Sequence, residues 1–366
     1  MPKIQEVIQY LDNFAPPSYQ ESYDNSGLLV GDLQAEVNGI LLCLDSTEAV
    51  VQEAIERHCN LIIAHHPIIF KGLKKITGKN HVERTILKAI RNDVAIYAIH
   101  TNLDNIWQGV NYQIAQILGL QNIRVLSPKP HTLSKLTTFV PQDHTKPVLQ
   151  ALSKAGAGQI GNYQNCSFRT TGIGTFQPNE YANPHIGTAN QLEEVQEDRI
   201  EVIFPSYLQN KILQALRQAH PYEEIAYYLH LLENHNQEVG SGAIGTLTEA
   251  MPAHDFLAYL KQKMHLTCIK HTALLDKKIQ TIALCGGAGI SLLPQAIAHQ
   301  ADIFITADIK YHEFFEADQR IILADIGHYE SEIFTKNLLF EVLSKKFTSF
   351  AIYLANTSTN PVNYFI

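Results

Sequence analysis

The sequence predicts an α/β protein whose mostly parallel α/β domain is interrupted by an inserted α+β domain of the ferredoxin-like type. Three observations predict this. Short apolar runs alternate with helical stretches in the first third of the chain, a looser pattern begins near residue 129, and the first pattern returns after about residue 245. A chain of 366 residues is too long for one ordinary core, and its 45% hydrophobic content is sufficient for two.

The segments 1–128 and 240–366 are expected to form one discontinuous domain. Apolar runs separated by helices favour βαβ units and a largely parallel sheet. Its expected strands are 38–44, 60–64, 93–99, 278–285, 302–306 and 320–326. Its expected helices are 4–13, 48–58, 81–91, 110–119, 254–264, 290–299, 311–317 and 329–346.

The segment 130–238 is expected to form the inserted domain, because a domain's termini often lie close together. Its pattern reads strand–helix–strand twice, which fits a ferredoxin-like fold. The expected strands are 136–141, 166–176, 200–205 and 223–232, and the expected helices are 145–155 and 206–219. The stretch 177–198 is rich in Asn, Pro and Glu and is expected to be an exposed loop.

Composition narrows the class of protein. The formal net charge of −8 and the pI of about 6.1 disfavour a nucleic-acid or anionic-membrane partner. Five scattered cysteines without a CxxC pair indicate free thiols in a reducing cytosol. The first 14 residues do not resemble a signal peptide, and no apolar stretch approaches the roughly 18 residues of a membrane helix. We therefore expect a cytoplasmic protein.

Histidines and carboxylates follow the expected strands. His65 and His66 end the run NLIIA, and Pro67 stops regular pairing there, so the turning chain can direct both rings into one cleft. Asp104 follows the strand that ends before His100. As a carboxylate beside a histidine pair, Asp104 can bridge two cations, although a helix-cap role is also open to it. His100 is expected to orient a ligand or to handle a proton.

A second motif follows the last expected strand. His328 and Glu332 are four residues apart where a helix begins, so they share one helix face. Glu330 is the competing carboxylate, but it projects roughly 160° away from Glu332 around the helix. Each motif alone also fits ordinary surface or strand-end residues.

Together the motifs indicate a hydrolytic site for two metal ions about 3.5–4 Å apart. The carboxyl ends of strands are where open α/β sheets place such sites. The expected ligands are His65, His66, Asp104, His328 and Glu332. His100 and His312 are the candidate catalytic residues, as proton shuttles or as hydrogen-bonding partners of the ligands.

Two glycine-rich segments carry weaker signals. The segment 240–245 matches a dinucleotide-binding pattern but lacks a βαβ context, so a dinucleotide site is disfavoured. The segment 285–289 (CGGAG) follows an expected strand and opens a helix. Its amides are suited either to binding an anion or to forming a tight strand–helix turn.

The sequence resembles the Nif-three-like family, whose members are also known as GTP cyclohydrolase I type 2 homologs. The resemblance covers roughly 1–128 and 240–366. The matching motifs are DNSGL at 24–28, AHHP at 64–67, HTNLD at 100–104, GSGAIG at 240–245, CGGAG at 285–289, TADIKYHE at 306–313 and GHYESE at 327–332. Ala307 stands where glycine is commoner in the family.

This resemblance implies two divalent metal ions per chain, with zinc, iron and manganese as candidates, held by the five ligands named above. It implies that 130–238 is a PII/CutA-like domain and that the chain forms a homohexamer. It implies a metal-dependent hydrolase of the GTP cyclohydrolase 1 type 2 kind, with a nucleotide or another small molecule as substrate. The alternative is a non-catalytic metal-binding scaffold or regulator with the insert as sensor or docking domain.

Overall fold

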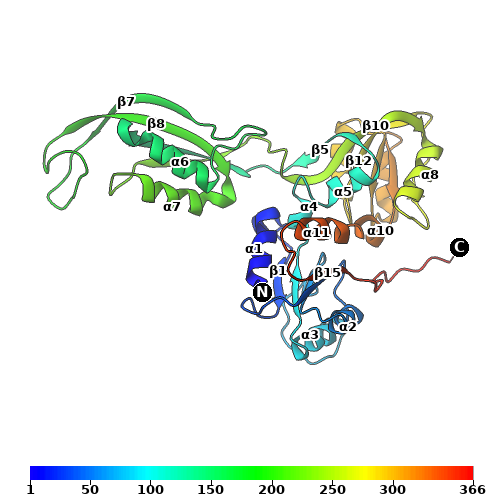
Figure 1. Ribbon diagram of the computed structural model, residues 1–366. Helices are drawn as coiled ribbons and strands as arrows, with labels where there is room; N and C mark the ends of the chain where they lie inside the picture. Colours follow the sequence, from blue (N-terminus) through cyan, green and yellow to red (C-terminus); the bar gives the residue numbers. More distant parts are fainter. Residues whose placement is uncertain (366) are drawn as a thin grey trace. The chain divides into compact units, whose positions relative to one another are not determined.

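A computed structural model describes residues 1–365 and separates into two compact units (Figure 1). Unit 1 contains Met1–Pro128 and Gln237–Ile366, and unit 2 contains Lys129–Asn236. Unit 1 carries two sheets and unit 2 carries one, so the fold is a mixed α/β fold with several sheets. The expectation of one mostly parallel sheet in the main domain is therefore corrected.

The first sheet of unit 1 has the strand order β1-β4-β3-β2-β15. Its strands are β1 (Gly27–Val30), β2 (Gly39–Cys43), β3 (Leu61–Ala64), β4 (Ala95–Ala98) and β15 (Ala351–Leu354). All neighbours are parallel except β1, which runs antiparallel to β4. One face packs on α2 (Glu48–Glu56) and α3 (His81–Arg91), where apolar residues recur at helical spacing.

The second sheet of unit 1 has the order β11-β14-β13-β12-β10-β5. Its strands are β5 (Gln121–Pro128), β10 (Gly240–Pro252), β11 (Lys270–His271), β12 (Lys278–Leu284), β13 (Ile303–Thr306) and β14 (Ile322–Asp325). Only β12, β13 and β14 are parallel neighbours. The glycine-rich segment 240–245 lies inside the paired strand β10, which leaves no dinucleotide-binding turn there.

A shared hydrophobic core joins the two sheets of unit 1. It includes Leu42 and Ile63 from the first sheet and Ile282 and Ile305 from the second. The helices around it are α1 (Ile4–Phe14), α4 (Thr101–Asp104), α5 (Val110–Ile117), α8 (Ala253–Lys263) and α11 (Thr335–Ser344). On the other face of the second sheet, a smaller core includes α9 (Leu293–Ala298).

Two expected helices of unit 1 are modified. The expected helix 329–346 is divided into α10 (His328–Glu332) and α11, with a break at Ile333 and Phe334. The expected helix at 311–317 is a 3-10 helix, η5 (Tyr311–Ala317). In residues 1–365, no helix has the length and apolar character needed to cross a membrane.

Unit 2 is a four-stranded antiparallel sheet with two helices on one face. The strand order is β7-β8-β6-β9 and the chain order is β6-α6-β7-β8-α7-β9. The elements are β6 (Leu133–Pro141), α6 (Thr145–Ala155), β7 (Phe168–Phe176), β8 (Glu193–Pro205), α7 (Gln209–Ala219) and β9 (Tyr227–Leu232). Strand β8 begins inside the expected loop 177–198, because its polar first half pairs with β7.

The short 3-10 helices complete the described chain. They are η1 (Pro17–Tyr19), η2 (Gln142–His144), η3 (Ser206–Leu208) and η4 (Ile290–Leu292).

Candidate metal centre

The five expected ligands lie just beyond the ends of three strands of unit 1. His65 and His66 follow β3, and Asp104 ends α4, which begins three residues after β4. His328 and Glu332 are the first and last residues of α10, which follows β14 of the other sheet. The carboxyl ends of strands from both sheets therefore contribute to one cluster.

Three groups of ligand atoms, each with all atoms within 4.8 Å of one another, make up this cluster. One group is His65, Asp104 and Glu332, and the second is His66, His328 and Glu332. The third is His65, His66 and His100. Such groups of imidazole and carboxylate can hold a divalent metal ion.

Glu332 is the residue that belongs to both carboxylate-containing groups. Its Oε2 lies 2.9 Å from His66 Nε2 and 3.1 Å from His328 Nε2. Its Oε1 lies 3.8 Å from His65 Nε2. Asp104 Oδ1 lies 3.6 Å from the same His65 nitrogen. The carboxylate that faces both halves of the cluster is thus Glu332, where the sequence had suggested Asp104.

The Nδ1 atoms of the imidazoles are held by acceptors outside the cluster. His65 donates to the backbone oxygen of Ile99 at 2.9 Å, and His66 donates to Asp45 at 2.7 Å. His328 donates to Asp308 at 2.7 Å. Because each Nδ1 donates a proton, Nε2 is the atom left to face the cluster, and the acceptor also fixes the ring's orientation.

Two buried polar atoms at the centre of the cluster make no hydrogen bond. His65 Nε2 and Asp104 Oδ1 have no partner in the described chain, although the His65 side chain is completely buried. Buried polar atoms are normally hydrogen-bonded, and leaving one unpaired costs about 1–3 kcal/mol. A cation bound between a neutral Nε2 and a carboxylate oxygen would satisfy both atoms, so the residues present fit a metal ion.

The charges of the cluster affect one another strongly. Burial lowers the pKa of His66, but its hydrogen bonds to Asp45 and Glu332 outweigh this effect and raise the pKa to about 10. Burial also lowers the pKa of His328, but its hydrogen bonds to Glu332 and Asp308 outweigh this effect and raise the pKa to about 9. Burial and then the charge of Glu332 raise the pKa of Asp104. Burial, in contrast, lowers the pKa of His65, so the raised pKa values favour protons on His66 and His328 but not on His65 when no cation is bound.

The glycine-rich segment 285–289 forms a tight turn that packs against the cluster. Three of its amides donate to side chains outside the segment: Gly286 to Asn111, Gly287 to Ser331 and Gly289 to Thr306. With these three amides occupied, a tight turn is favoured over an anion site. A Cβ on Gly287, whose φ is +62°, would stand 2.4 Å from Glu332 Oε1. The missing side chain leaves room for the shared carboxylate.

The two candidate catalytic histidines have different surroundings. The His100 ring lies 5.3 Å from the rings of both His65 and His66, and its Nδ1 donates to Asp24 at 2.8 Å. His312 is exposed on η5, with its ring 5.2 Å from that of Tyr311. Among the described residues, the three groups of ligand atoms do not include His312.

Three carboxylates around the cluster were missed by reasoning from the sequence alone. Asp24, Asp45 and Asp308 each accept a hydrogen bond from the Nδ1 atom of a cluster histidine. Asp24 also accepts from the backbone and side chain of Thr101. Asp24 begins the DNSGL motif and Asp308 lies in TADIKYHE. Both aspartates therefore lie in motifs that carry the family resemblance, but neither of them was assigned a role from the sequence.

The fold and this cluster define a candidate metal-binding protein of mixed α/β architecture. Residues 2–361 match the family described as Duf34/NIF3 (NGG1p interacting factor 3). The chain belongs to this family, as its motifs indicated.

Relatives of similar length support this membership. A protein of Bacillus subtilis and one of Halalkalibacterium halodurans are 36% and 39% identical to this chain, over 98% of both chains in each case. Both are named "GTP cyclohydrolase 1 type 2 homolog". The crystal structure of a Bacillus cereus protein related to NIF3 is also similar, with 38% identity and a TM-score of 0.87. That comparison covers 100% of this chain and 99% of the other.

Proposed function

We propose that unit 1 binds two divalent metal ions that share Glu332. One position is defined by His65, Asp104 and Glu332, and the other by His66, His328 and Glu332. The observation that carries the proposal is the orientation of Glu332, whose two oxygens face different histidines. Zinc, iron and manganese all suit imidazole and carboxylate ligands, so the donor set selects no single metal.

We further propose that the site is hydrolytic. Two divalent ions would supply Lewis-acid activation of water and of a substrate oxygen. Three protein ligands at each position leave coordination space for water or substrate. His100, hydrogen-bonded to Asp24, is placed to hold or move a proton beside the ligands. The names of the relatives make a nucleotide the first substrate to test.

A specific observation favours a second candidate, a non-catalytic metal-binding scaffold or regulator. A ligand atom of His100 lies within 4.8 Å of those of His65 and His66. If His100 binds a cation together with His65, that position gains a fourth protein ligand. A four-ligand site is typical of structural metals, whereas a catalytic site keeps one position open. The role of His100 therefore separates the two candidates.

The decisive experiment is a hydrolysis screen on the metal-loaded protein, with GTP and other nucleotides as substrates. Glu332→Ala serves as the blank, and His100→Ala is measured alongside it. A hydrolase predicts turnover by the wild type and a rate about 10²–10⁴-fold lower for His100→Ala with both ions retained. Metal loss in His100→Ala, together with an inactive wild type, supports the scaffold.

We also propose that unit 2 is a PII/CutA-like domain and that the chain assembles as a closed homohexamer. The order β6-α6-β7-β8-α7-β9 is that of a ferredoxin-like fold, which supports the first proposal. The hexamer rests on the resemblance alone. Light scattering tests it, and a monomer at micromolar concentration would contradict it.

A further inference from the structure

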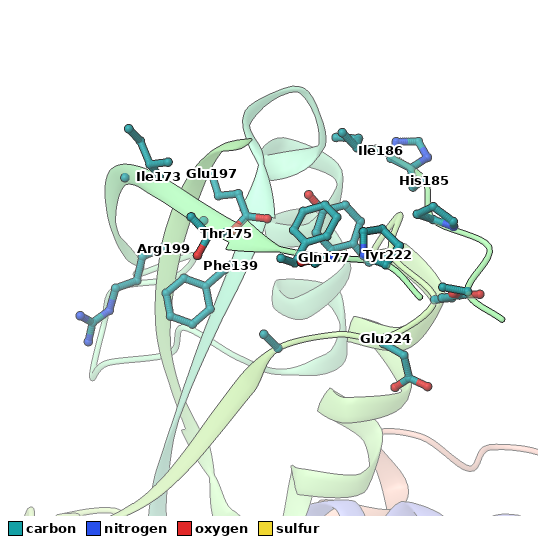
Figure 2. A pocket seen from close by; sticks show the side chains of 18 of the residues that line it. Phe139, Ile173, Thr175, Gln177, His185, Ile186, Glu197, Arg199, Tyr222 and Glu224 are labelled. Carbon is teal, nitrogen blue, oxygen red and sulfur yellow. The ribbon is translucent and has the colours of Figure 1, made fainter. Parts of the chain in front are cut away.

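A cavity in unit 2 is separate from the candidate metal centre and has no role in the proposed function. It measures about 620 Å³ and lies on the sheet face opposite the two helices (Figure 2). Phe139 of β6, Gly172 of β7, Glu197 of β8 and Tyr228 of β9 all contribute to its lining. Its volume is within the range of small-molecule sites in proteins, roughly 300–1,000 Å³.

A buried carboxylate lies inside this cavity. Glu197 is only 8% exposed, and Figure 2 shows its carboxylate pointing toward Tyr222. The buried Tyr222 hydroxyl lies against it but makes no hydrogen bond of good geometry with a residue of the described chain. Burial and then the contact with Glu197 raise the pKa of Tyr222. A carboxylate has about four acceptor positions, so Glu197 can accept from a bound donor in addition to its contact with the Tyr222 hydroxyl.

The charge of the lining favours a cation as that donor. Glu197, Glu223 and Glu224 line the cavity, and Arg199 is the one Lys or Arg side chain among the described lining residues. The guanidinium of Arg199 is already paired with Glu201. The three carboxylates therefore exceed the basic groups that could neutralise them.

Aromatic rings also line the cavity. Phe139 and Tyr228 form an edge-to-face pair with centroids 5.9 Å apart, and Phe176 and Tyr222 form another at 5.8 Å. Aromatic faces attract cations and also stack on flat rings. The aromatic walls and the internal carboxylate together suit a ring that carries a positive charge.

Glycines of β7 give the cavity its depth. A Cβ on Gly172 would meet nothing within 4 Å, whereas a Cβ on Gly174 would stand 2.2 Å from Glu197 Oε2. Gly174 thus makes room for the carboxylate, and Gly172 borders open space. The loop after β7 closes one side, where the Asn183 amide donates to Glu223 at 2.8 Å.

We propose that this cavity binds a small aromatic cation, a flat ring bearing a protonated amine or amidine, with Glu197 as its counter-ion. The cation donates to the Glu197 carboxylate while its ring lies among Phe139, Phe176, Tyr222 and Tyr228. Unit 2 is thereby a ligand-binding domain in its own right.

The test uses three probes of nearly identical shape and different charge: benzamidine, benzamide and benzoate. Isothermal titration calorimetry on the full chain measures their affinities. Benzamidine is expected to bind about 10- to 100-fold more tightly than benzamide, because its hydrogen bond to the carboxylate is charge-assisted. Benzoate is expected not to bind. Absence of benzamidine binding, or equal binding of benzoate, overturns the proposal.

Matched variants locate the binding. Glu197→Gln removes the charge with little change in shape, and Gly172→Leu fills the open space beside β7. Each is expected to weaken benzamidine binding by about tenfold or more. Glu194→Gln, an exposed change on the same strand, is the control and is expected to bind as the wild type does. Circular dichroism checks folding, and Gly172→Leu decides if Glu197→Gln does not fold. Undiminished binding in both folded variants overturns the assignment.

Discussion

The cluster in unit 1 and the cavity in unit 2 both contain a buried carboxylate, but its surroundings differ. Glu332 is within hydrogen-bonding distance of the Nε2 atoms of His66 and His328, and other carboxylates hold the outer nitrogens of these rings. Glu197 instead lines a cavity together with aromatic side chains and glycines. Imidazoles fixed by acceptors suit a metal ion, whereas aromatic walls suit an organic ring. The neighbours of a carboxylate thus decide which kind of cation it suits.

The largest expected effect follows from removing the shared carboxylate. Glu332→Ala should lose both metal ions, because Glu332 belongs to both groups of ligand atoms. Asp104→Ala should lose one, since Asp104 belongs to a single group. Elemental analysis of purified variants measures this, and Glu330→Ala is the control because Glu330 instead accepts a hydrogen bond from Asn360. Equal metal loss in the Glu332 and Asp104 variants would indicate that Asp104 is the carboxylate that bridges the two ions.

The pH dependence of metal binding should also be large. Hydrogen bonds to carboxylates outweigh burial and raise the pKa of His66 to about 10 and that of His328 to about 9. Both rings are therefore expected to be protonated at neutral pH in the metal-free protein, and each proton must leave before Nε2 can bind a cation. Affinity should rise with pH, by up to about tenfold per pH unit for each proton released.

Manganese titrations between pH 6 and pH 8 measure this dependence. Proton release on metal addition in weakly buffered solution is the independent check. An affinity that stays flat across this range would show that the histidines are neutral before the metal binds.

A smaller effect is expected from the carboxylates that hold the rings. Asp45→Ala removes the acceptor of His66 Nδ1 and frees the ring to rotate. Metal affinity should fall by about 10- to 100-fold while the number of ions at saturation stays at two. A competition titration with a chelator measures the loss. The exposed Asp32→Ala is the control and should leave the affinity unchanged.

The smallest expected effect concerns the independence of the two units. In unit 1, Pro128 of β5 pairs directly with Gly240 of β10, so the chain leaves and returns at adjacent strands. Replacing residues 129–236 by a short Gly/Ser linker should therefore leave unit 1 folded with unchanged metal content. Loss of cooperative unfolding or of metal in the shortened chain would show that unit 1 depends on unit 2.

The sequence predicted much of the cluster because its ligands follow apolar strands. His65, His66 and Asp104 come after two such runs, and His328 and Glu332 open a helix after a third. The place of Glu332 in two groups of ligand atoms depends on how α10 faces the other sheet, which no local pattern encodes. Single aspartates such as Asp45 have no periodicity and act on rings that are remote in the sequence.

The division of unit 1 into two sheets was missed for a similar reason. Strand pairing is set by contacts between segments that are distant in the sequence. The residues of a run such as Leu61–Ala64 do not indicate which strands will pair with it. Strand β10 was missed because its glycines resemble a turn. The cavity in unit 2 could not be predicted from the sequence either, because its lining comes from all four strands and from the loop after β7.

Anomalous X-ray diffraction from manganese- or zinc-loaded crystals tests the central claim most directly. The account predicts two peaks per chain, about 3.5–4 Å apart, with Glu332 between them. One peak should lie beside His65 and Asp104, and the other beside His66 and His328. A single peak, or two peaks of which one does not touch Glu332, would contradict the shared-carboxylate site.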